Sequence, residues 1–261
     1  MDVRFLDILG NKPQLVSEFP TWMLSDTEID ELRKIDDLAI VEIAGRDSIA
    51  AAIESAKTRN LDAILPTIAY TATEYGDWEI PFQKVEFLKG KMQECGVKVF
   101  LPLVLGSPDF WWKLCGRYAS HLFREFGFYT PCIGCHLYLH AIRIPLAKKI
   151  RCQLIIGGER EKHDDRVKIN QIDTVLDAYE NFMASFGIEL LLPLRHIRSS
   201  GDIEGIIGEK WDEGSKQMQC VMSKNYLDRD NDVEYSKKKI ERFLDEFAMK
   251  VAEQEVQKIL K

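Results

Sequence analysis

Three cysteines have the spacing of metal or cluster ligands. Cys132 and Cys135 are separated by two residues, and Cys220 stands alone further along the chain. A turn between the first two brings both sulfurs to one side, where they can grip one metal ion or cluster. Three thiolates on a four-iron cluster leave one iron open for a substrate or a sulfur atom. A structural zinc with His136 or His140 as fourth ligand is the competing interpretation.

Other interpretations of the paired cysteines have less support. A Cys-x-x-Cys-His pattern also attaches c-type haem, but no secretion signal precedes it. A thioredoxin-like redox pair is a further alternative, although its usual aromatic-flanked context is missing. Cys95, Cys115 and Cys152 lie in apolar stretches and are predicted to be buried and to take no part in metal binding.

The segment from Ala44 to Ser48 has the composition of a phosphate-binding loop. It follows an apolar run and opens an alanine-rich stretch, so it predicts a strand end leading into a helix start. A helix N-terminus offers free N–H groups and positive dipole to a phosphate. Gly45 permits close approach, Arg46 adds charge, Asp47 is a candidate Mg²⁺ ligand and Ser48 a hydroxyl donor. An ordinary Asp-Ser helix cap is the alternative.

A second polar segment follows a later apolar run. Gly157 and Gly158 are candidate cofactor-binding residues, and they lead into charged residues that include Asp164 and Asp165. Asp164 or Asp165 could steer magnesium, with simple solvation of these charges as the alternative. Arg195 and Arg198 follow the last apolar run and could bind phosphate or RNA backbone, with a surface role as the default.

Apolar runs alternate with helical stretches after residue 37, which predicts an α/β fold. The sheet is expected to be doubly wound and mostly parallel, with about five strands and helices on both faces. The strands are predicted at 38–43, 62–68, 97–105, 152–157 and 188–194, and the helices at 47–58, 81–95, 109–126, 135–149 and 171–186.

Three regions are expected along the chain. Residues 1–36 form a leader with a helix capped by Ser25, residues 37–225 the α/β domain, and residues 226–261 a helical extension. In that extension one face carries Ile240, Phe243, Leu244, Phe247 and Val251, which predicts a long amphipathic helix packed on the domain. The aromatic run from Phe110 to Trp112, with Tyr118, is predicted to pack in the core.

Composition predicts an acidic, globular, cytoplasmic protein. The chain has 261 residues, 46% of them hydrophobic, and a formal net charge of −7. No apolar run approaches the roughly 20 residues that span a bilayer, so no membrane partner is expected. The acidic balance argues against wholesale coating of nucleic acid.

Taken together, these elements resemble the PP-loop ATP pyrophosphatase superfamily, in particular its iron–sulfur-dependent tRNA 2-thiolation enzymes. Members carry Ser-Gly-Gly-x-Asp-Ser after the first core strand; here Gly45, Asp47 and Ser48 match, whereas the first serine and first glycine do not. Cys132 and Cys135, a strand ending in glycines, and a late Cys220 follow in the family's order. The resemblance covers about residues 37 to 225.

The resemblance implies ATP-dependent sulfur transfer. ATP with Mg²⁺ would adenylate a carbonyl oxygen of a tRNA base or a small molecule, and sulfur from a 4Fe-4S cluster would replace that oxygen. The implied partners are the sulfur acceptor and a sulfur donor protein or sulfide, and a homodimer is a further expectation. The alternatives are a cluster-dependent desulfurase, a zinc-stabilised interaction module and a nucleotide-binding module without catalysis.

Overall fold

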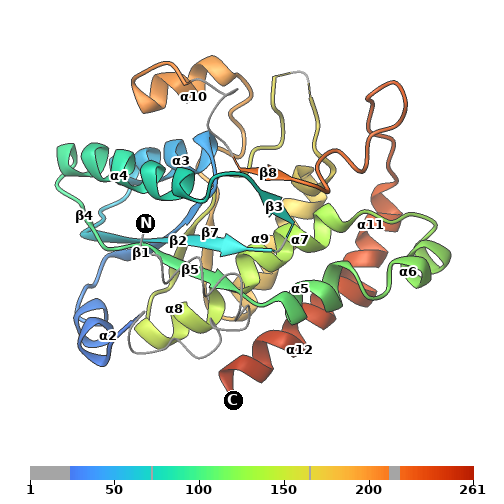
Figure 1. Ribbon diagram of the computed structural model, residues 1–261, viewed down its shortest axis with the longest axis horizontal. Helices are drawn as coiled ribbons and strands as arrows, with labels where there is room; N and C mark the ends of the chain where they lie inside the picture. Colours follow the sequence, from blue (N-terminus) through green and yellow to red (C-terminus); the bar gives the residue numbers. More distant parts are fainter. Residues whose placement is uncertain (1–23, 72, 165, 212–217) are drawn as a thin grey trace.

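A parallel β-sheet lies at the centre of the molecule (Figure 1). The computed structural model describes residues 24–71, 73–164, 166–211 and 218–261. The strands are β1 (Leu38–Ile43), β2 (Ala63–Tyr70), β4 (Lys98–Val99), β5 (Leu103–Gly106), β6 (Leu154–Ile156) and β7 (Glu189–Leu191). Their order is β4-β2-β1-β6-β7, with β5 also paired to β2, and every pair in this sheet is parallel. The predicted α/β fold with a parallel sheet is confirmed.

One edge of the sheet is interrupted. The predicted strand at 97–105 is two short strands, because β4 pairs with Ala63 and Ile64 whereas β5 pairs with Thr67 to Tyr70 of the same strand β2. Pro102 stands in the gap, and a proline has no N–H to donate to a ladder. The division of the predicted strand 97–105 is therefore explained by Pro102 within it.

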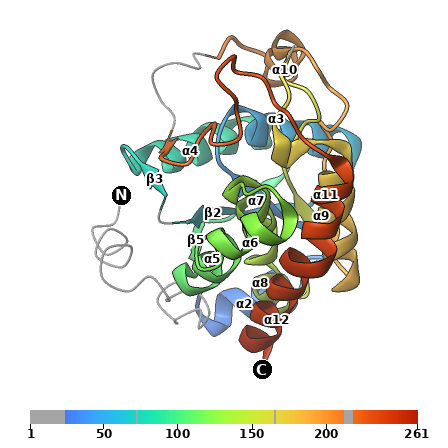
Figure 2. The same ribbon diagram turned by 90° about the vertical axis from the view of Figure 1, so that its right-hand side faces the viewer.

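Helices cover both faces of the sheet (Figures 1 and 2). One face carries α3 (Arg46–Thr58), α4 (Glu79–Glu94) and α10 (Ser200–Ile207); the other carries α5 (Pro108–Cys115), α7 (Pro131–Ala141), α8 (Ile144–Ile150) and α9 (Asp173–Ser185). Successive residues of β1 belong to opposite cores: Leu38 and Ile40 pack on the α7 side, Ala39 and Val41 on the α3 side. Because both faces are buried, the strand reads as a continuous apolar run.

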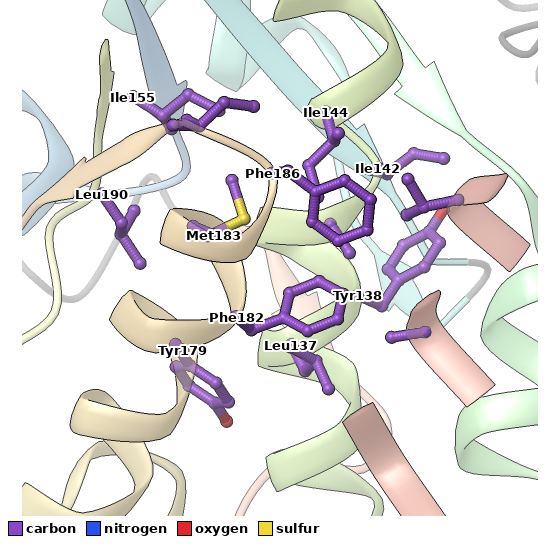
Figure 3. Close-up of a cluster of buried hydrophobic side chains, with 14 of the residues drawn as sticks. Leu137, Tyr138, Ile142, Ile144, Ile155, Tyr179, Phe182, Met183, Phe186 and Leu190 are labelled. Carbon is purple, nitrogen blue, oxygen red and sulfur yellow. The ribbon is translucent and has the colours of Figure 1, made fainter. Parts of the chain in front are cut away.

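The larger core lies between the sheet and helices α7, α8 and α9 (Figure 3). Its labelled side chains come from these helices, from Ile142 and Phe186 at the ends of α7 and α9, and from β6 and β7, and Tyr138 and Tyr179 are fully buried with them. Burying one such large side chain contributes about 1.5–3 kcal/mol. This core fixes α7, the helix that carries the paired cysteines.

Two predicted helices are each divided. The stretch 109–126 is α5 and α6 (Ala119–Phe126), separated at Gly116, where α5 ends. The stretch 135–149 is α7 and α8, because Pro145 in the first turn of α8 lacks the N–H that a continuous helix needs. Helix α7 also begins earlier than predicted, at Pro131 after the cap Thr130, so both cysteines lie inside its first turns.

The C-terminal extension packs on the larger core as predicted. It consists of α11 (Lys237–Phe243), a π-helical turn (Leu244–Ala248) and α12 (Met249–Leu260). The wider turn keeps Leu244, Ala248, Ala252 and Val256 buried along one side, whereas Phe247 and Val251 are only partly buried. No helix among the described residues is long and apolar enough to cross a membrane.

Two elements were not predicted: α10 and a small antiparallel sheet of β3 (Glu74–Tyr75) and β8 (Gln219–Cys220). Ser25 caps α2 (Asp26–Leu32) as expected, accepting from the N–H of Glu28. Most of the predicted leader, residues 1–23, lies outside the described residues.

Candidate functional site

The candidate site lies where the sheet order reverses. Strands β1 and β6 are neighbours, and the chain continues from them toward opposite edges of the sheet. Ligands of open α/β sheets bind outside the carboxyl ends of the strands at such a switch point. Here the loop 44–48 follows β1 and the loop 157–160 follows β6. The structure thus brings together the two polar segments singled out from the sequence.

Asp47 lies among cations at this point. Its Oδ1 accepts from Arg46 Nε at 3.0 Å and its Oδ2 accepts from Arg160 Nε at 2.9 Å. Burial opposes the charge of Asp47, but Arg160 and Arg46 outweigh it and lower the pKa of the carboxyl. Because each oxygen already accepts a hydrogen bond from a guanidinium, a magnesium ion at Asp47 would share the carboxylate with Arg46 and Arg160, whose positive charges repel it.

The predicted phosphate loop is closed on itself. The Ser48 hydroxyl accepts from the N–H groups of Ala44 and Gly45 at 3.0 and 3.2 Å, and it donates to the Gly45 carbonyl at 2.7 Å. Gly158 lies against the same helix start, since a Cβ added there would be 2.6 Å from the Ser48 nitrogen. The Ser48 hydroxyl is therefore already hydrogen-bonded within the loop, and Gly158 occupies the space in front of the α3 N-terminus.

More positive charge surrounds Asp47 than one carboxylate neutralises. Lys168 is half-buried beside Asp47 and Arg160, and burial lowers its pKa. Lys84 from α4 donates to the Ala44 carbonyl at 3.3 Å, and burial lowers its pKa to about 8. Burial, with Lys168 and Arg160 nearby, lowers the pKa of His163 to about 4, so this imidazole is neutral at pH 7. An excess of cations favours an anionic ligand.

A second charged group is buried below the loops. His140 Nδ1 lies 2.7 Å from Glu42 Oε1, and His140 Nε2 lies 3.4 Å from Glu159 Oε1. Arg143 reaches Glu42 at 3.4 Å and donates through Nε to Thr67 Oγ1 at 2.7 Å. Burial opposes the charge of His140, but Glu42 and Glu159 raise its pKa; burial likewise opposes ionisation of Glu159, but His140 and His136 lower its pKa to about 2.

Sequence reasoning missed this group. Glu42, His140 and Glu159 each offer a ligand atom within 4.8 Å of the others, and a metal ion could be held there. His140 was considered only as a fourth zinc ligand beside the cysteines. The available signal was Glu42, a charged residue inside the buried apolar strand β1.

The structure brings the three predicted cysteines into one region. Asn225 Nδ2 donates to Cys132 Sγ at 2.8 Å, which draws the segment after β8 over the start of α7. Cys220 lies in β8 opposite Glu74, and the ionisation of both Cys132 and Cys135 is coupled to it electrostatically. The predicted trio therefore comes from two distant segments that pack together.

Each of these sulfurs has a hydrogen-bond donor. Trp111 Nε1 donates to Cys135 Sγ at 3.2 Å, and the Met222 N–H donates to Cys220 Sγ at 3.4 Å. Burial raises the pKa of both Cys132 and Cys135. A reactive redox pair needs a lowered thiol pKa, so this environment does not support the thioredoxin-like alternative.

The two histidines of the zinc alternative face elsewhere. His136 Nδ1 lies 3.3 Å from Glu159 Oε1, and His140 lies between Glu42 and Glu159. In the described ranges, the Glu42 group is the one set of three ligand atoms that all lie within 4.8 Å of one another. Zinc holds its sulfur ligands at about 2.3 Å, so the more widely spaced cysteines do not form a single-ion site as they stand.

Two of the remaining predicted polar residues, Asp164 and Arg195, have partners within the protein. Asp164 accepts from the N–H and hydroxyl of Ser200 at 2.9 and 2.7 Å. Arg195 is ion-paired to Glu161, Asp177 and Glu180, and Arg198 is exposed. Asp165 lies outside the described residues.

The prediction that the aromatic run packs in the core is wrong in part. Phe110 is buried, but Trp112 and Tyr118 are 49% and 38% exposed. Arg117 lies between them, with its guanidinium 5.3 Å from each ring centroid. The helix α5 is short and one of its faces is exposed, whereas the sequence predicted one long helix at 109–126 with these aromatic residues in the core.

Fold and site together define a doubly wound α/β protein with a charged switch point and a neighbouring cysteine group. No family model matches the chain. It is 43% identical over 216 residues, covering 82% of this chain and 78% of the relative, to "Uncharacterized protein MJ0009" of Methanocaldococcus jannaschii. The chain belongs to the same family as this archaeal protein.

Proposed function

We propose that this protein binds an iron–sulfur cluster through Cys132, Cys135 and Cys220 and uses it in sulfur transfer. The observation that carries the proposal is the convergence of these thiols from two distant segments, each with a hydrogen-bond donor. Thiolates are the ligands of such clusters, and each would bind a different iron, which suits sulfurs that are not gathered around one ion. When bound, the cluster would offer one iron without a protein ligand to hold sulfur.

The chain's own residues prepare this region. The N–H donors of Trp111 and Asn225 compensate negative charge on Cys135 and Cys132, and hydrogen bonds to the sulfurs tune such a centre. Both cysteines lie in the first turns of α7, where the helix dipole favours an anion. Thr130, the α7 cap, donates to Asn225 and so positions the amide that contacts Cys132.

The ATP-dependent form of the proposal uses the cations around Asp47. A carbonyl oxygen would attack the α-phosphorus of ATP and pyrophosphate would leave; a sulfur nucleophile would then displace AMP, which carries the oxygen away. Arg46, Arg160 and Lys168 supply positive charge beside the loop after β1. Asp47 does not fit a magnesium ligand as it stands, so no step is assigned to magnesium there.

A tRNA acceptor is supported by the surface beside the cysteines. Trp112, Arg117 and Tyr118 form an exposed aromatic–arginine group next to Trp111, which contacts Cys135. Unpaired bases stack on such side chains.

A desulfurase that acts without ATP is the second candidate. It is favoured by the closed loop, since Ser48 is occupied by its own cap and Gly158 lies against the α3 N-terminus. Pyrophosphate release on incubation with ATP and acceptor would select the transferase. Sulfide release from a thiolated base without ATP would select the desulfurase.

The cluster is tested by anaerobic purification, an ultraviolet–visible spectrum and analysis of iron, sulfide and zinc. We expect a brown protein with about four irons and four sulfides per chain, lost in Cys132→Ala and Cys220→Ala. Cys95→Ala is the matched control because Cys95 has no role in the proposed group and is exposed, so the prediction that it is buried is wrong. A colourless wild type carrying zinc, or equal iron in all variants, would contradict the proposal.

A further inference from the structure

We propose that the buried Glu42–His140–Glu159 group binds one divalent transition-metal ion, separate from the cysteine region. In this site His140 Nε2 and the Glu159 carboxylate are the direct ligands, and Glu42 orients His140 from the other side of the ring. His136, which contacts Glu159, is the residue at the entrance. None of the three residues Glu42, His140 and Glu159 takes part in the proposed sulfur transfer.

The orientation of His140 points to a metal ligand. Its Nδ1 is 2.7 Å from Glu42 Oε1 and donates a hydrogen bond to this carboxylate, so a metal ion would bind at Nε2 in place of a proton. Histidines that bind metals usually donate their second ring N–H to a carboxylate or carbonyl in this way. His140 Nε2 is buried, the side chain is 0% exposed, and the nitrogen has no hydrogen-bond partner in the described structure.

Glu159 supplies the second ligand. Its Oε1 is 3.4 Å from His140 Nε2 and 3.3 Å from His136 Nδ1, while its buried Oε2 has no hydrogen-bond partner among the residues described. Zinc binds imidazole nitrogen and carboxylate oxygen at about 2.0–2.2 Å, so two ligands of one ion lie about 3 Å apart. The observed separation of His140 and Glu159 is close to this value. An unpaired buried nitrogen and an unpaired buried oxygen thus face one region.

Gly157 allows the two carboxylates to approach. A Cβ at this position would be 2.6 Å from Glu159 Oε2 and 3.5 Å from Glu42 Oε2. Any side chain there would meet the carboxylate of Glu159, so the glycine keeps the oxygen side of the site open. This function of Gly157 differs from the cofactor contact that the sequence predicted for it.

The charge and the donor types select the kind of ion. Two buried carboxylates lie here: Arg143 approaches Glu42 at 3.4 Å, and a metal ion that replaces the proton on His140 Nε2 would supply the positive charge beside Glu159. A mixed imidazole and carboxylate set suits zinc, manganese or iron better than magnesium or calcium, which prefer oxygen alone. His136 is partly exposed and contacts Glu159, which gives an ion a path from the surface.

Metal binding to a cluster-free protein tests this inference. The Cys132→Ala/Cys220→Ala double variant removes two proposed cluster ligands and is stripped with a chelator, then titrated with Co²⁺ and with Zn²⁺. We expect one equivalent of each metal to bind, a visible Co²⁺ absorption band, and a higher melting temperature with Zn²⁺. Glu42→Gln should weaken Zn²⁺ affinity about 10- to 100-fold, and His140→Gln more than that.

Two comparisons keep the result interpretable. Glu161→Gln is the control, because Glu161 is two residues from Glu159 but pairs with Arg195; it should bind Zn²⁺ like the parent. If the buried variants do not fold, His136→Gln in the wild-type background replaces them, with an expected loss of Zn²⁺ affinity of about tenfold. Absence of stoichiometric binding and of any rise in melting temperature in the folded parent and in wild type overturns the site. If the wild type holds no cluster iron but the protein still binds one Zn²⁺ that His140→Gln removes, the cluster proposal is contradicted and the metal site at His140 is supported.

Discussion

The two charged groups at the switch point are built in opposite ways. Around Asp47, three cations surround one carboxylate that is 21% exposed; around His140, two carboxylates enclose a fully buried imidazole. The first group has most of its hydrogen bonds made within the protein, whereas the second leaves a ring nitrogen and a carboxylate oxygen without partners. The difference teaches that an excess of cations around a partly exposed carboxylate suits an anion, whereas buried ligand atoms without hydrogen-bond partners suit a metal ion.

The largest effect is expected in the buried group. Arg143→Met should destabilise the protein by about 3–5 kcal/mol, because it removes a buried charge partner of Glu42 and the donors to Thr67 and the Leu139 carbonyl. Urea unfolding of the two proteins measures it. Arg59→Met is the control, since Arg59 makes an exposed pair with Glu189 and should cost less than about 1 kcal/mol. Equal losses in both variants would show that Glu42 does not depend on Arg143.

The next largest effect is expected at Gly158, which lies against the start of α3. Gly158→Ala should cost about 1–3 kcal/mol, because the new Cβ would be 2.6 Å from a backbone nitrogen of α3. Gly90→Ala, with open space around it in a helix, should instead stabilise by about 0.5–1 kcal/mol. Thermal melts of both variants compare them. A harmless Gly158→Ala would mean that the loop moves away from α3.

Asp47→Asn probes the cationic group through pH. Since the folded state lowers the pKa of Asp47, the carboxylate contributes stability above its unfolded pKa of about 3.9, and this is lost as pH falls through the folded value. The variant should lose about 1–2 kcal/mol at pH 7 and little at pH 2. It should also bind sulfate more tightly. Equal losses at both pH values would separate Asp47 from this charge balance.

The smallest effect is expected at Lys84. Burial lowers its pKa to about 8, so the unfolded chain binds more protons between pH 8 and 10.5 and stability rises with pH across this window. Lys84→Met should abolish that rise. The lowered pKa corresponds to a gain of about 3 kcal/mol at pH 7, and loss of the hydrogen bond to the Ala44 carbonyl offsets about 2 kcal/mol of it, which leaves a net gain of about 1 kcal/mol. Denaturant midpoints at pH 7 and pH 10 measure the change. A variant whose midpoint still rises with pH would place the titrating group elsewhere.

The sequence predicted the layers well because they depend on local pattern. Strand β1 was predicted residue for residue, since a run buried on both faces is apolar throughout. The divisions at Pro102, Gly116 and Pro145 were missed because the apolar pattern continues across them. The site was predicted in part: the cysteine trio depends on spacing, whereas the His140 group joins β1, α7 and the loop after β6. Only the order of strands brings those segments together, and no motif encodes it.

The gap at Pro102 has a consequence for how copies of this protein meet. A long outer strand with free backbone groups can recruit the same strand of another molecule. Here that margin is two short pieces, with a residue between them that cannot donate and with Leu101 turned 75% into solvent. This edge of the sheet therefore offers no continuous row of backbone groups for a second chain to extend, which disfavours edge-to-edge pairing here.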